Sequence, residues 1–257
     1  MKVASRSCVA VDIGNTSVSM ARVAGEKVGP VERMPTHGAG KEAILRAIRR
    51  AAGPRGVDGA ALCSVVPSAE SKWKRYLESE LGRAPLLIRP SLELGVGIDY
   101  PRPSRIGADR LANASGAVAR YGAPVIVADF GTAVTFDVVS ARPAYVGGVI
   151  APGLPLMTDY LCERTALLPR VMLGGRSGRG AIGRSTKAAM RIGARVGYGG
   201  MVRAIVDRIR EDLDASEATL CATGGYARWV LEQVDLPFVF DPVLTLYGVA
   251  RIFRLNP

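Results

Sequence analysis

The fold is decided by two similar stretches, Cys8-Val-Ala-Val-Asp12-Ile-Gly14-Asn15-Thr16-Ser-Val-Ser-Met-Ala-Arg-Val23 and Val125-Ile-Val-Ala-Asp129-Phe-Gly131-Thr132-Ala-Val-Thr-Phe-Asp-Val-Val139. In each stretch an apolar strand ends in Asp, a glycine-containing turn with Thr follows, and a second strand begins. This pattern is typical of a β-hairpin. The distance from the first Asp to the second is far too long for a solenoid repeat. The sequence therefore predicts two copies of one small domain.

Each copy continues as alternating strand and helix patterns, which favours an α/β fold. In the first half we predict strands over 59–66 and 85–88 and helices over 41–52, 68–81 and 108–121. In the second half we predict strands over 145–150 and 218–223 and helices over 155–164, 225–234 and 243–253. The helical region 185–212 contains four glycines, so we expect it to bend or break there. Residues 92–104 and 173–183 are expected to be Gly-rich loops.

Length and composition exclude several classes of protein. A chain of 257 residues with 48% hydrophobic residues needs no disulfide or metal to stabilise its core. Its formal charge of +11 comes mostly from Arg. The basic residues are spread along the chain without interleaved aromatic residues, which disfavours nucleic-acid binding. Neither a membrane span nor a signal peptide is recognisable, so we expect a cytoplasmic protein that does not bind membranes.

The residue types that usually bind metal are sparse. The four cysteines are far apart and form no CxxC pair, which argues against a disulfide framework or a zinc site. The single histidine, His37, lies in a loop with Gly and Pro, where we expect it to be exposed and without a catalytic role.

The two Asp hairpins suit a nucleotide triphosphate. A carboxylate at a strand end can hold Mg²⁺ through water, and a glycine turn lets backbone N–H groups approach phosphate oxygens. Thr16 and Thr132 add hydroxyl donors. One such hairpin is a common turn, whereas two copies favour a clamp that holds phosphates from both sides. A third element, Thr223-Gly224-Gly225 between an apolar strand and a helix, would allow close approach to a nucleoside.

Together these three elements resemble the actin-like ATPase superfamily. The blocks Gly107-Ala108-Asp109-Arg110 and Asp129-Phe-Gly131-Thr132-Ala are similar to those of type III pantothenate kinases, and the resemblance covers essentially the whole chain from about Cys8. Further matching blocks are Tyr145-Val-Gly147-Gly148-Val-Ile-Ala-Pro152-Gly153 and Leu244-Thr-Leu-Tyr-Gly248. The resemblance implies two ribonuclease-H-like domains, residues 1–118 and 119–257, with mixed sheets flanked by helices and an interdomain cleft.

The resemblance also implies an activity and a set of residues. ATP would phosphorylate the hydroxyl of pantothenate to 4′-phosphopantothenate, the first step of coenzyme A biosynthesis, with Asp109 as the base. Pantothenate would contact Tyr100, Gly107, Ala108, Asp109, Arg110 and Thr186. The nucleotide would contact Asp12, Ile13, Gly14, Asn15, Thr16, Ser17, Val18, Ser19, Gly131, Thr132, Thr223, Gly224 and Gly225. Asp12 would hold Mg²⁺ through water, and Asp129 would hold a monovalent cation, K⁺ or NH₄⁺. A homodimer with Thr186 near the interface is implied as well.

The residues support these roles on chemical grounds. Arg110 or Arg102 suits the carboxylate of pantothenate. An ionised Asp is a weak base, but a loose phosphoryl-transfer transition state asks more of positioning than of basicity. Asp109 could also cap the helix that begins near Arg110. The sequence departs from the family pattern at Ser185, usually Asn, and at Ile192-Gly193, usually Ser-Gly, so the shape of the pantothenate pocket is open.

Three other interpretations remain. The string 178–183 matches G-x-G-x-x-G, and 178–185 nearly matches a P-loop with Arg184 in place of Lys, but neither has the required flanking strand. A catalytically inactive actin-like homologue could act as a transcription accessory or binding protein. The charge keeps that idea open, although Asp12, Asp109 and Asp129 are all retained. Another small-molecule kinase or phosphatase of the same superfamily is the third alternative.

Overall fold

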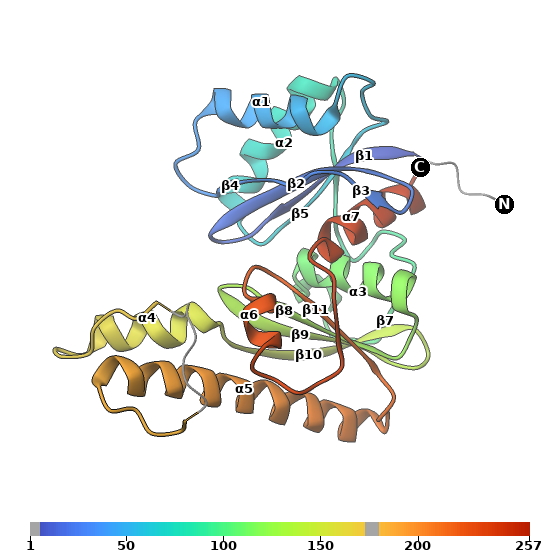
Figure 1. Cartoon of the computed structure of the whole chain (residues 1–257). Helices are drawn as coiled ribbons and strands as arrows, with labels where there is room; N and C mark the ends of the chain where they lie inside the picture. The colour runs from blue at the N-terminus through green and yellow to red at the C-terminus, as the bar shows by residue number, and fades with distance from the viewer. Residues whose placement is uncertain (1–5, 173–179) are drawn as a thin grey trace. The chain divides into compact units, whose positions relative to one another are not determined.

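The computed structural model describes residues 6–172 and 180–257, and it is a mixed α/β fold with two six-stranded sheets (Figure 1). The first sheet has the order β3-β2-β1-β5-β6, and β4 also pairs with β2. Its strands are β1 (Ser7–Ile13), β2 (Ser17–Ala24), β3 (Lys27–Val28), β4 (Glu32–Pro35), β5 (Ala60–Ser64) and β6 (Leu86–Leu87). β1 and β2 form the predicted antiparallel hairpin, and β5 runs parallel to β1 on its other side.

The second sheet has the order β12-β11-β8-β9-β10-β7. Its strands are β7 (Gly97–Ile98), β8 (Val125–Phe130), β9 (Ala133–Val139), β10 (Ala144–Pro152), β11 (Thr219–Thr223) and β12 (Phe238–Phe240). In both sheets the Asp hairpin is central. The first strand of each hairpin, β1 or β8, has the second strand of the hairpin on one side and a strand from later in the chain, β5 or β11, on the other. The order β2-β1-β5-β6 thus recurs as β9-β8-β11-β12, so the duplication predicted from the two Asp hairpins is present in the strand order.

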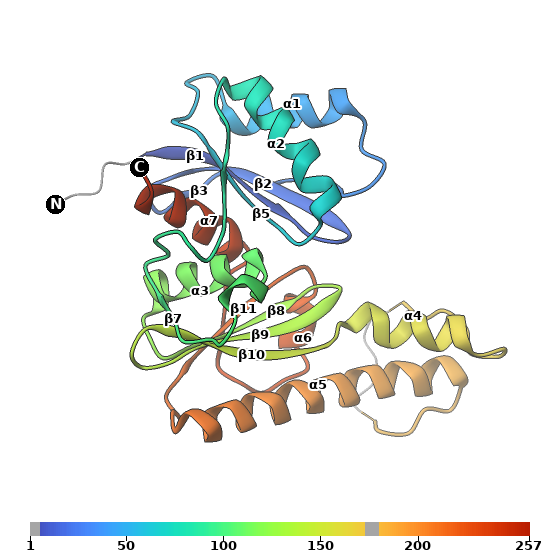
Figure 2. The same ribbon diagram turned by 180° about the vertical axis from the view of Figure 1, so that it is seen from behind.

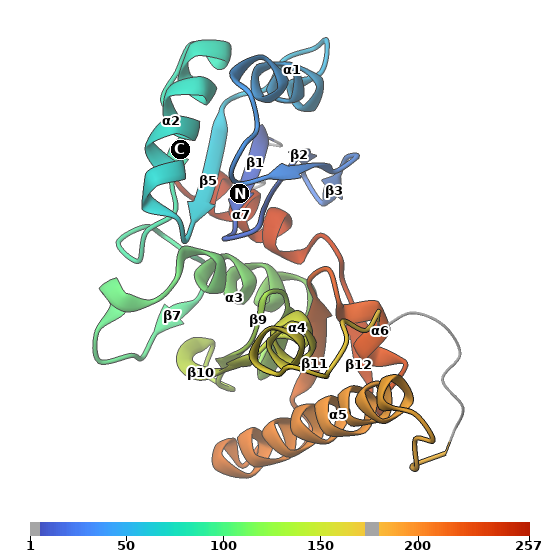
Figure 3. The same ribbon diagram turned by 90° about the vertical axis from the view of Figure 1, so that its left-hand side faces the viewer.

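Helices cover both faces of the first sheet (Figures 1 and 3). The α-helices of the chain are α1 (Lys41–Ala52), α2 (Pro67–Leu81), α3 (Ala108–Tyr121), α4 (Leu154–Arg164), α5 (Thr186–Leu213), α6 (Ala227–Leu231) and α7 (Leu244–Leu255). Side chains alternate across a strand. Val9, Val11 and Ile13 of β1 therefore pack in one core with α1 and α2, whereas Asp12 belongs to the opposite face, on the side of α7.

Two compact units make up the chain: Met1–Val125, Val138–Gly147 and Val243–Pro257 form the first, and Ile126–Asp137 and Gly148–Pro242 form the second. Within the first unit α3 packs directly on α7. A Cβ at Gly248 would lie 1.8 Å from the carbonyl oxygen of Ala112, so the two helix backbones touch where they cross. Thr245 Oγ1 donates a hydrogen bond of 2.8 Å to Asn113 Oδ1, and both side chains are buried. These contacts fix the direction of α3, whose first turn carries Asp109.

The predicted bend in 185–212 is wrong, because α5 is one continuous helix of 28 residues (Figure 2). Tyr198, Val202 and Val206 are fully buried and hold the helix against its unit. This burial outweighs the cost of each helical glycine, about 1 kcal/mol relative to Ala. Gly199 has a packing reason, since its Cβ would lie 3.1 Å from the carbonyl oxygen of Gln233.

Several other expectations are tested by the fold. All four cysteines are free, and His37 is exposed as predicted. The predicted helix over 225–234 is shorter than expected, since α6 spans only Ala227–Leu231. Part of the predicted loop 173–183, namely 173–179, lies outside the described residues. Within 6–172 and 180–257, none of the helices combines the length and the hydropathy needed to span a bilayer.

Candidate active site

The first Asp hairpin turns tightly between β1 and β2. The Gly14 N–H donates to the Ser17 carbonyl at 3.0 Å, which closes the turn, while Asn15, Thr16 and Ser17 are exposed at its tip. Thr36 is buried and holds the turn in place, because its hydroxyl donates to the Gly14 carbonyl at 2.6 Å. Its N–H also donates to the Thr16 carbonyl at 3.1 Å. The turn is thus held by its own backbone hydrogen bond and by Thr36, and its exposed polar groups can face a ligand.

Asp12, at the end of β1, lies beside a cysteine. In the parallel ladder Asp12 pairs with Cys63 of β5, and the Cys63 thiol donates to Asp12 Oδ1 at 3.3 Å. Burial raises the pKa of the Cys63 thiol well above its usual range, and the negative charges of Asp12 and Asp109 raise it further. Cys63 is therefore a neutral thiol. Since both carboxylates act on this one sulfur, the structure brings Asp12 and Asp109 to the same region of the first unit.

Asp109 lies in the first turn of α3. Gly107 is the N-cap, and a Cβ there would lie 2.5 Å from Asp109 Oδ1, so glycine leaves room for the carboxylate to fold back over the helix start. Asp109 Oδ1 accepts the Arg110 N–H at 2.8 Å, which satisfies one of the free donors of the first turn. Asp109 therefore supports the helix start without occupying the capping position itself.

The pKa of Asp109 is raised above its ordinary value. Burial is the largest cause, because it disfavours the charged form, while the N–H and the charge of Arg110 act in the opposite direction. A carboxylate with a raised pKa is a stronger base than an exposed Asp. This shift makes Asp109 better suited to accept a proton from an alcohol.

An aromatic pair lies next to Arg110. The rings of Tyr100 and Tyr145 meet edge to face, with centroids 6.1 Å apart, and the Arg110 guanidinium lies 5.7 Å from the Tyr145 ring centroid. Gly147, at a φ of +129°, belongs to the same group, since its Cβ would come within 3.5 Å of the Tyr100 ring. Tyr145 is fully buried and contacts both Tyr100 and Arg110, which are predicted to contact pantothenate.

The second Asp hairpin also has a tight turn, which is one residue shorter than the first. The Gly131 N–H donates to the Ala133 carbonyl at 3.0 Å, and Thr132 is exposed at the tip. The start of α4 packs against this turn: the Gly153 N–H donates to the Thr132 carbonyl at 3.1 Å, and a Cβ at Gly153 would lie 2.1 Å from the same oxygen. Only glycine allows this approach, which explains the glycine of the Pro152-Gly153 pair.

The Thr223-Gly224-Gly225 element lies against Asp129. Gly224 has a φ of +93°, and its Cβ would lie 2.6 Å from Asp129 Oδ1 and 2.6 Å from the backbone nitrogen of Phe130. The Tyr226 N–H donates to the Phe130 carbonyl at 3.0 Å, which holds the loop on the end of β8. The second unit thus brings the predicted cation residue and the predicted nucleoside element together.

Thr186 begins α5 in the second unit and is exposed. Ser185 is the N-cap, and its hydroxyl accepts the Ala188 N–H at 3.2 Å. Serine in place of the family's Asn therefore preserves the cap, since both residue types are good N-caps. Gly178 of the G-x-G-x-x-G string lies outside the described residues. No strand is present in 165–172 and 180–185, the described residues between α4 and α5, and the positions directly before Gly178 lie outside the described residues.

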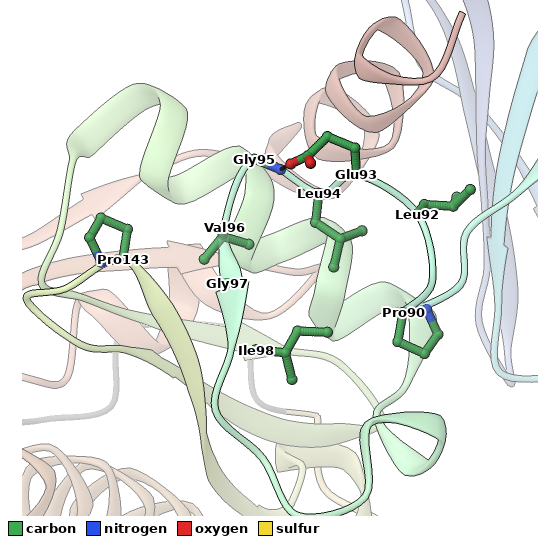
Figure 4. A pocket seen from close by; sticks show the side chains of 9 residues that line it. All are labelled: Pro90, Leu92, Glu93, Leu94, Gly95, Val96, Gly97, Ile98 and Pro143. Carbon is green, nitrogen blue, oxygen red and sulfur yellow. Dashed lines mark hydrogen bonds between the residues drawn. The ribbon is translucent and has the colours of Figure 1, made fainter.

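A separate pocket of about 490 Å³ lies in the first unit (Figure 4). It is lined by Pro90, Pro143 and residues 92–98, whose side chains are mostly apolar, but polar atoms make up the larger part of its exposed surface. None of the residues predicted for pantothenate or nucleotide lines it.

Sequence reasoning missed Cys63, Thr36 and the separate contribution of Tyr145. One signal could have identified Cys63. The strand over 59–66 follows a helix, so parallel pairing with the first strand was foreseeable, and residues near its carboxyl end would lie beside Asp12. No comparable local signal exists for Thr36, because its contact depends on β4 pairing with β2.

The chain matches a known protein family over most of its length. The family model of type III pantothenate kinase matches residues 8–208. The chain belongs to the type III pantothenate kinase family. It is 39% identical over 245 residues to a type III pantothenate kinase of Methylacidiphilum infernorum, covering 95% of this chain and 87% of the relative. It is 40% identical over 255 residues to one from Acidiphilium cryptum, covering 96% and 94%.

Solved structures confirm the actin-like ATPase fold of this family member. The chain is similar to a protein described as a Baf family transcriptional activator from Campylobacter jejuni, with a TM-score of 0.62 and 17% identity over 97% of this chain and 98% of that one. A ROK family glucokinase from Streptomyces griseus gives a TM-score of 0.54 at 13% identity, with 96% and 97% covered. At such identities these likenesses concern the fold alone.

Proposed function

We propose that this protein transfers the γ-phosphoryl group of ATP to the hydroxyl of pantothenate, the first step of coenzyme A biosynthesis. One observation carries the proposal. In a member of the type III pantothenate kinase family, the Gly107–Arg110 block forms a helix start whose Asp109 has a raised pKa. The same block meets the Tyr100–Tyr145 pair through Arg110. The carboxylate of Asp109, the guanidinium of Arg110 and the Tyr100–Tyr145 rings are thus grouped in the first unit.

In this mechanism Asp109 accepts the hydroxyl proton of pantothenate as the oxygen attacks the γ-phosphorus. Proton removal is late in a loose transition state, so the main task of Asp109 is to hold the hydroxyl in line. Arg110 would pair with the pantothenate carboxylate, and Tyr100 would pack against its apolar part. Thr186 would contribute a further polar contact to the substrate.

The two Asp hairpins would bind the triphosphate. Their backbone N–H groups and the hydroxyls of Thr16 and Thr132 are the donors, and Thr223 to Gly225 would receive the nucleoside. Mg²⁺ neutralises developing charge on the phosphates when it is bound. Among the described residues no group of three or more acidic, Cys or His side chains is gathered. A single carboxylate such as that of Asp12 fits Mg²⁺, which usually binds one or two carboxylates together with waters and phosphates.

A coupled assay with ATP, Mg²⁺, K⁺ and pantothenate tests the proposal. Turnover should require all four components, and a panel of other acceptor alcohols should be used poorly. Activity with another alcohol alone would favour a different kinase of the superfamily. Absence of activity together with salt-dependent retention of DNA in a gel shift would favour the binding-protein alternative.

Replacement of K⁺ by Na⁺ should lower turnover at least several-fold. ATP brings about four negative charges beside the Asp129 carboxylate in this proposal, and a fitted monovalent cation would reduce that repulsion. The coupled assay should be repeated at constant ionic strength with K⁺, NH₄⁺, Na⁺ or a bulky organic cation. Equal rates in all four salts would remove the cation role proposed for Asp129.

We also propose a homodimer formed through the second unit. Large apolar side chains are exposed near the end of β10, on α4, in the described segments between α4 and α5, and on α5. α5 packs beside α4 (Figures 1 and 2). This patch consists of Ile150, Leu156, Tyr160, Leu161, Leu167, Met172, Ile182 and Val196. Exposed fractions reach 90% at Leu167 and 87% at Ile182. Monomeric proteins rarely expose so many large apolar side chains on two packed helices and the segments beside them, so a second copy of the chain is a suitable cover.

Tyr160→Glu should separate the dimer, because it places a charge on α4 among these exposed apolar side chains. Analytical ultracentrifugation should give a dimer for the parent chain and a monomer for this variant at micromolar concentration. Val239→Glu is the matched control, since Val239 is exposed on β12 of the same unit but lies outside the patch. A parent chain that sediments as a monomer would overturn the proposal.

A further inference from the structure

A buried cysteine, Cys63, lies beside Asp12. Asp12 and Cys63 are paired across the β1–β5 ladder, and the Cys63 sulfur lies 3.3 Å from Asp12 Oδ1. The Val11 carbonyl is the other acceptor near this sulfur, but it is more distant, at 3.8 Å. Cys63 is fully buried, so no solvent competes for its proton. The shorter contact marks the carboxylate as the acceptor of the thiol.

We infer that Cys63 is a positioning residue for Asp12: its S–H group holds one carboxylate oxygen and fixes the rotation of the side chain. The torsion that turns an Asp carboxylate is broad and has weak intrinsic preference, so an unassisted side chain would sample many orientations. A donor on the adjacent strand removes that freedom before any ligand arrives. The inference rests on the proposed function, in which Asp12 serves Mg²⁺ and the nucleotide phosphates.

The residue type at position 63 fits this role. The side chain must be small, because β5 is buried between helices at this point, and it must be neutral, because it lies near both Asp12 and Asp109. It must also carry a donor. Serine meets all three conditions, whereas alanine and valine lack the donor. Substitution at this position can therefore separate hydrogen bonding from packing.

The test measures ligand binding rather than turnover. Dissociation constants for Mg²⁺ with a non-hydrolysable ATP analogue are determined by isothermal titration calorimetry. Cys63→Ala and Cys63→Val should weaken binding about three- to tenfold, since each loses one hydrogen bond to a charged group. Cys63→Ser should stay within twofold of the parent. Cys8→Ala is the matched control, because Cys8 is also a fully buried thiol, on β1, and should leave binding unchanged.

A double-mutant cycle with Asp12→Ala separates positioning from general damage. Once the carboxylate is gone, Cys63→Ala should weaken binding no further. If Cys63→Ala behaves like Cys8→Ala, or if Cys63→Ser binds as weakly as Cys63→Ala, the inference is overturned. If Asp12→Ala itself leaves binding unchanged, the proposed role of Asp12 fails, and the inference fails with it. Thermal unfolding of each variant establishes that the fold is retained.

Discussion

Asp109→Asn is expected to reduce turnover by about 10²- to 10⁴-fold, the usual contribution of a positioned general base. The amide keeps the shape and the hydrogen bond from the Arg110 N–H but cannot take the proton of the substrate hydroxyl. Binding of Mg²⁺ and an ATP analogue should change little, because Asp109 serves the acceptor rather than the donor. Turnover within a few-fold of the parent would show that Asp109 is not the base.

The same variant should be more stable than the parent at neutral pH. Burial raises the pKa of Asp109 in the folded chain, so the ionised carboxylate disfavours folding at every pH above that raised pKa. As the pH falls through the raised pKa toward the ordinary value, about 3.9, the parent carboxyl is protonated and the penalty disappears. The stability difference between variant and parent should therefore be present at pH 7 and vanish near pH 4.

Asp58→Asn is the matched control, because it should change the stability at neutral pH in the opposite direction. The N–H and the hydroxyl of Ser7 both donate to Asp58 and lower the pKa of its carboxyl. The ionised form thus stabilises the fold above the ordinary pKa, and this contribution is lost as the pH falls through the lowered value. Asp58→Asn should therefore lower the midpoint of thermal unfolding at pH 7 and leave turnover near that of the parent. Equal shifts of the unfolding midpoint in Asp109→Asn and Asp58→Asn would contradict the opposite pKa directions of the two carboxyl groups.

The sequence predicted most of the fold for a specific physical reason. The two Asp hairpins combine strand periodicity with turn chemistry, and both signals are local, so their duplication could be recognised without coordinates. α5 could not be predicted as continuous, because its stability comes from burial of Tyr198, Val202 and Val206, which overrides the local effect of glycine. Short strands such as β4 and β12 were missed, because their pairing depends on contacts with distant strands.

The candidate site was predicted less completely. The two hairpins pointed to Asp12 and Asp129 as carboxylates at strand ends, and the family resemblance pointed to Asp109; their roles stay predictions. The supporting contacts were not visible, since they join segments far apart in the chain. Cys63 reaches Asp12 from a different strand, and Tyr145 reaches Tyr100 from a different segment. Roles carried by one residue are therefore easier to predict than the neighbours that orient it.

Gly224→Ala should abolish most nucleotide binding. The new Cβ would lie 2.6 Å from Asp129 Oδ1 and from two backbone atoms of Phe130, and the residue would also be held at a φ of +93°. Backbone atoms cannot move aside as a flexible side chain can, so the loop that carries Thr223 and Gly225 must shift away from β8. We expect at least a tenfold rise in the dissociation constant of an ATP analogue and a loss of about 2–4 kcal/mol in unfolding free energy.

Gly122→Ala separates backbone strain from steric overlap. Gly122 has a similar φ of +78°, but nothing lies within 4 Å of its Cβ. This control should lose only about 1–2 kcal/mol and should bind the ATP analogue like the parent. The comparison is sharp, because both variants add one methyl group at a left-handed glycine and only one of them displaces the strand end that carries Asp129. If Gly224→Ala binds the analogue as well as Gly122→Ala does, the loop does not receive the nucleoside, and the adenosine must be bound by other residues.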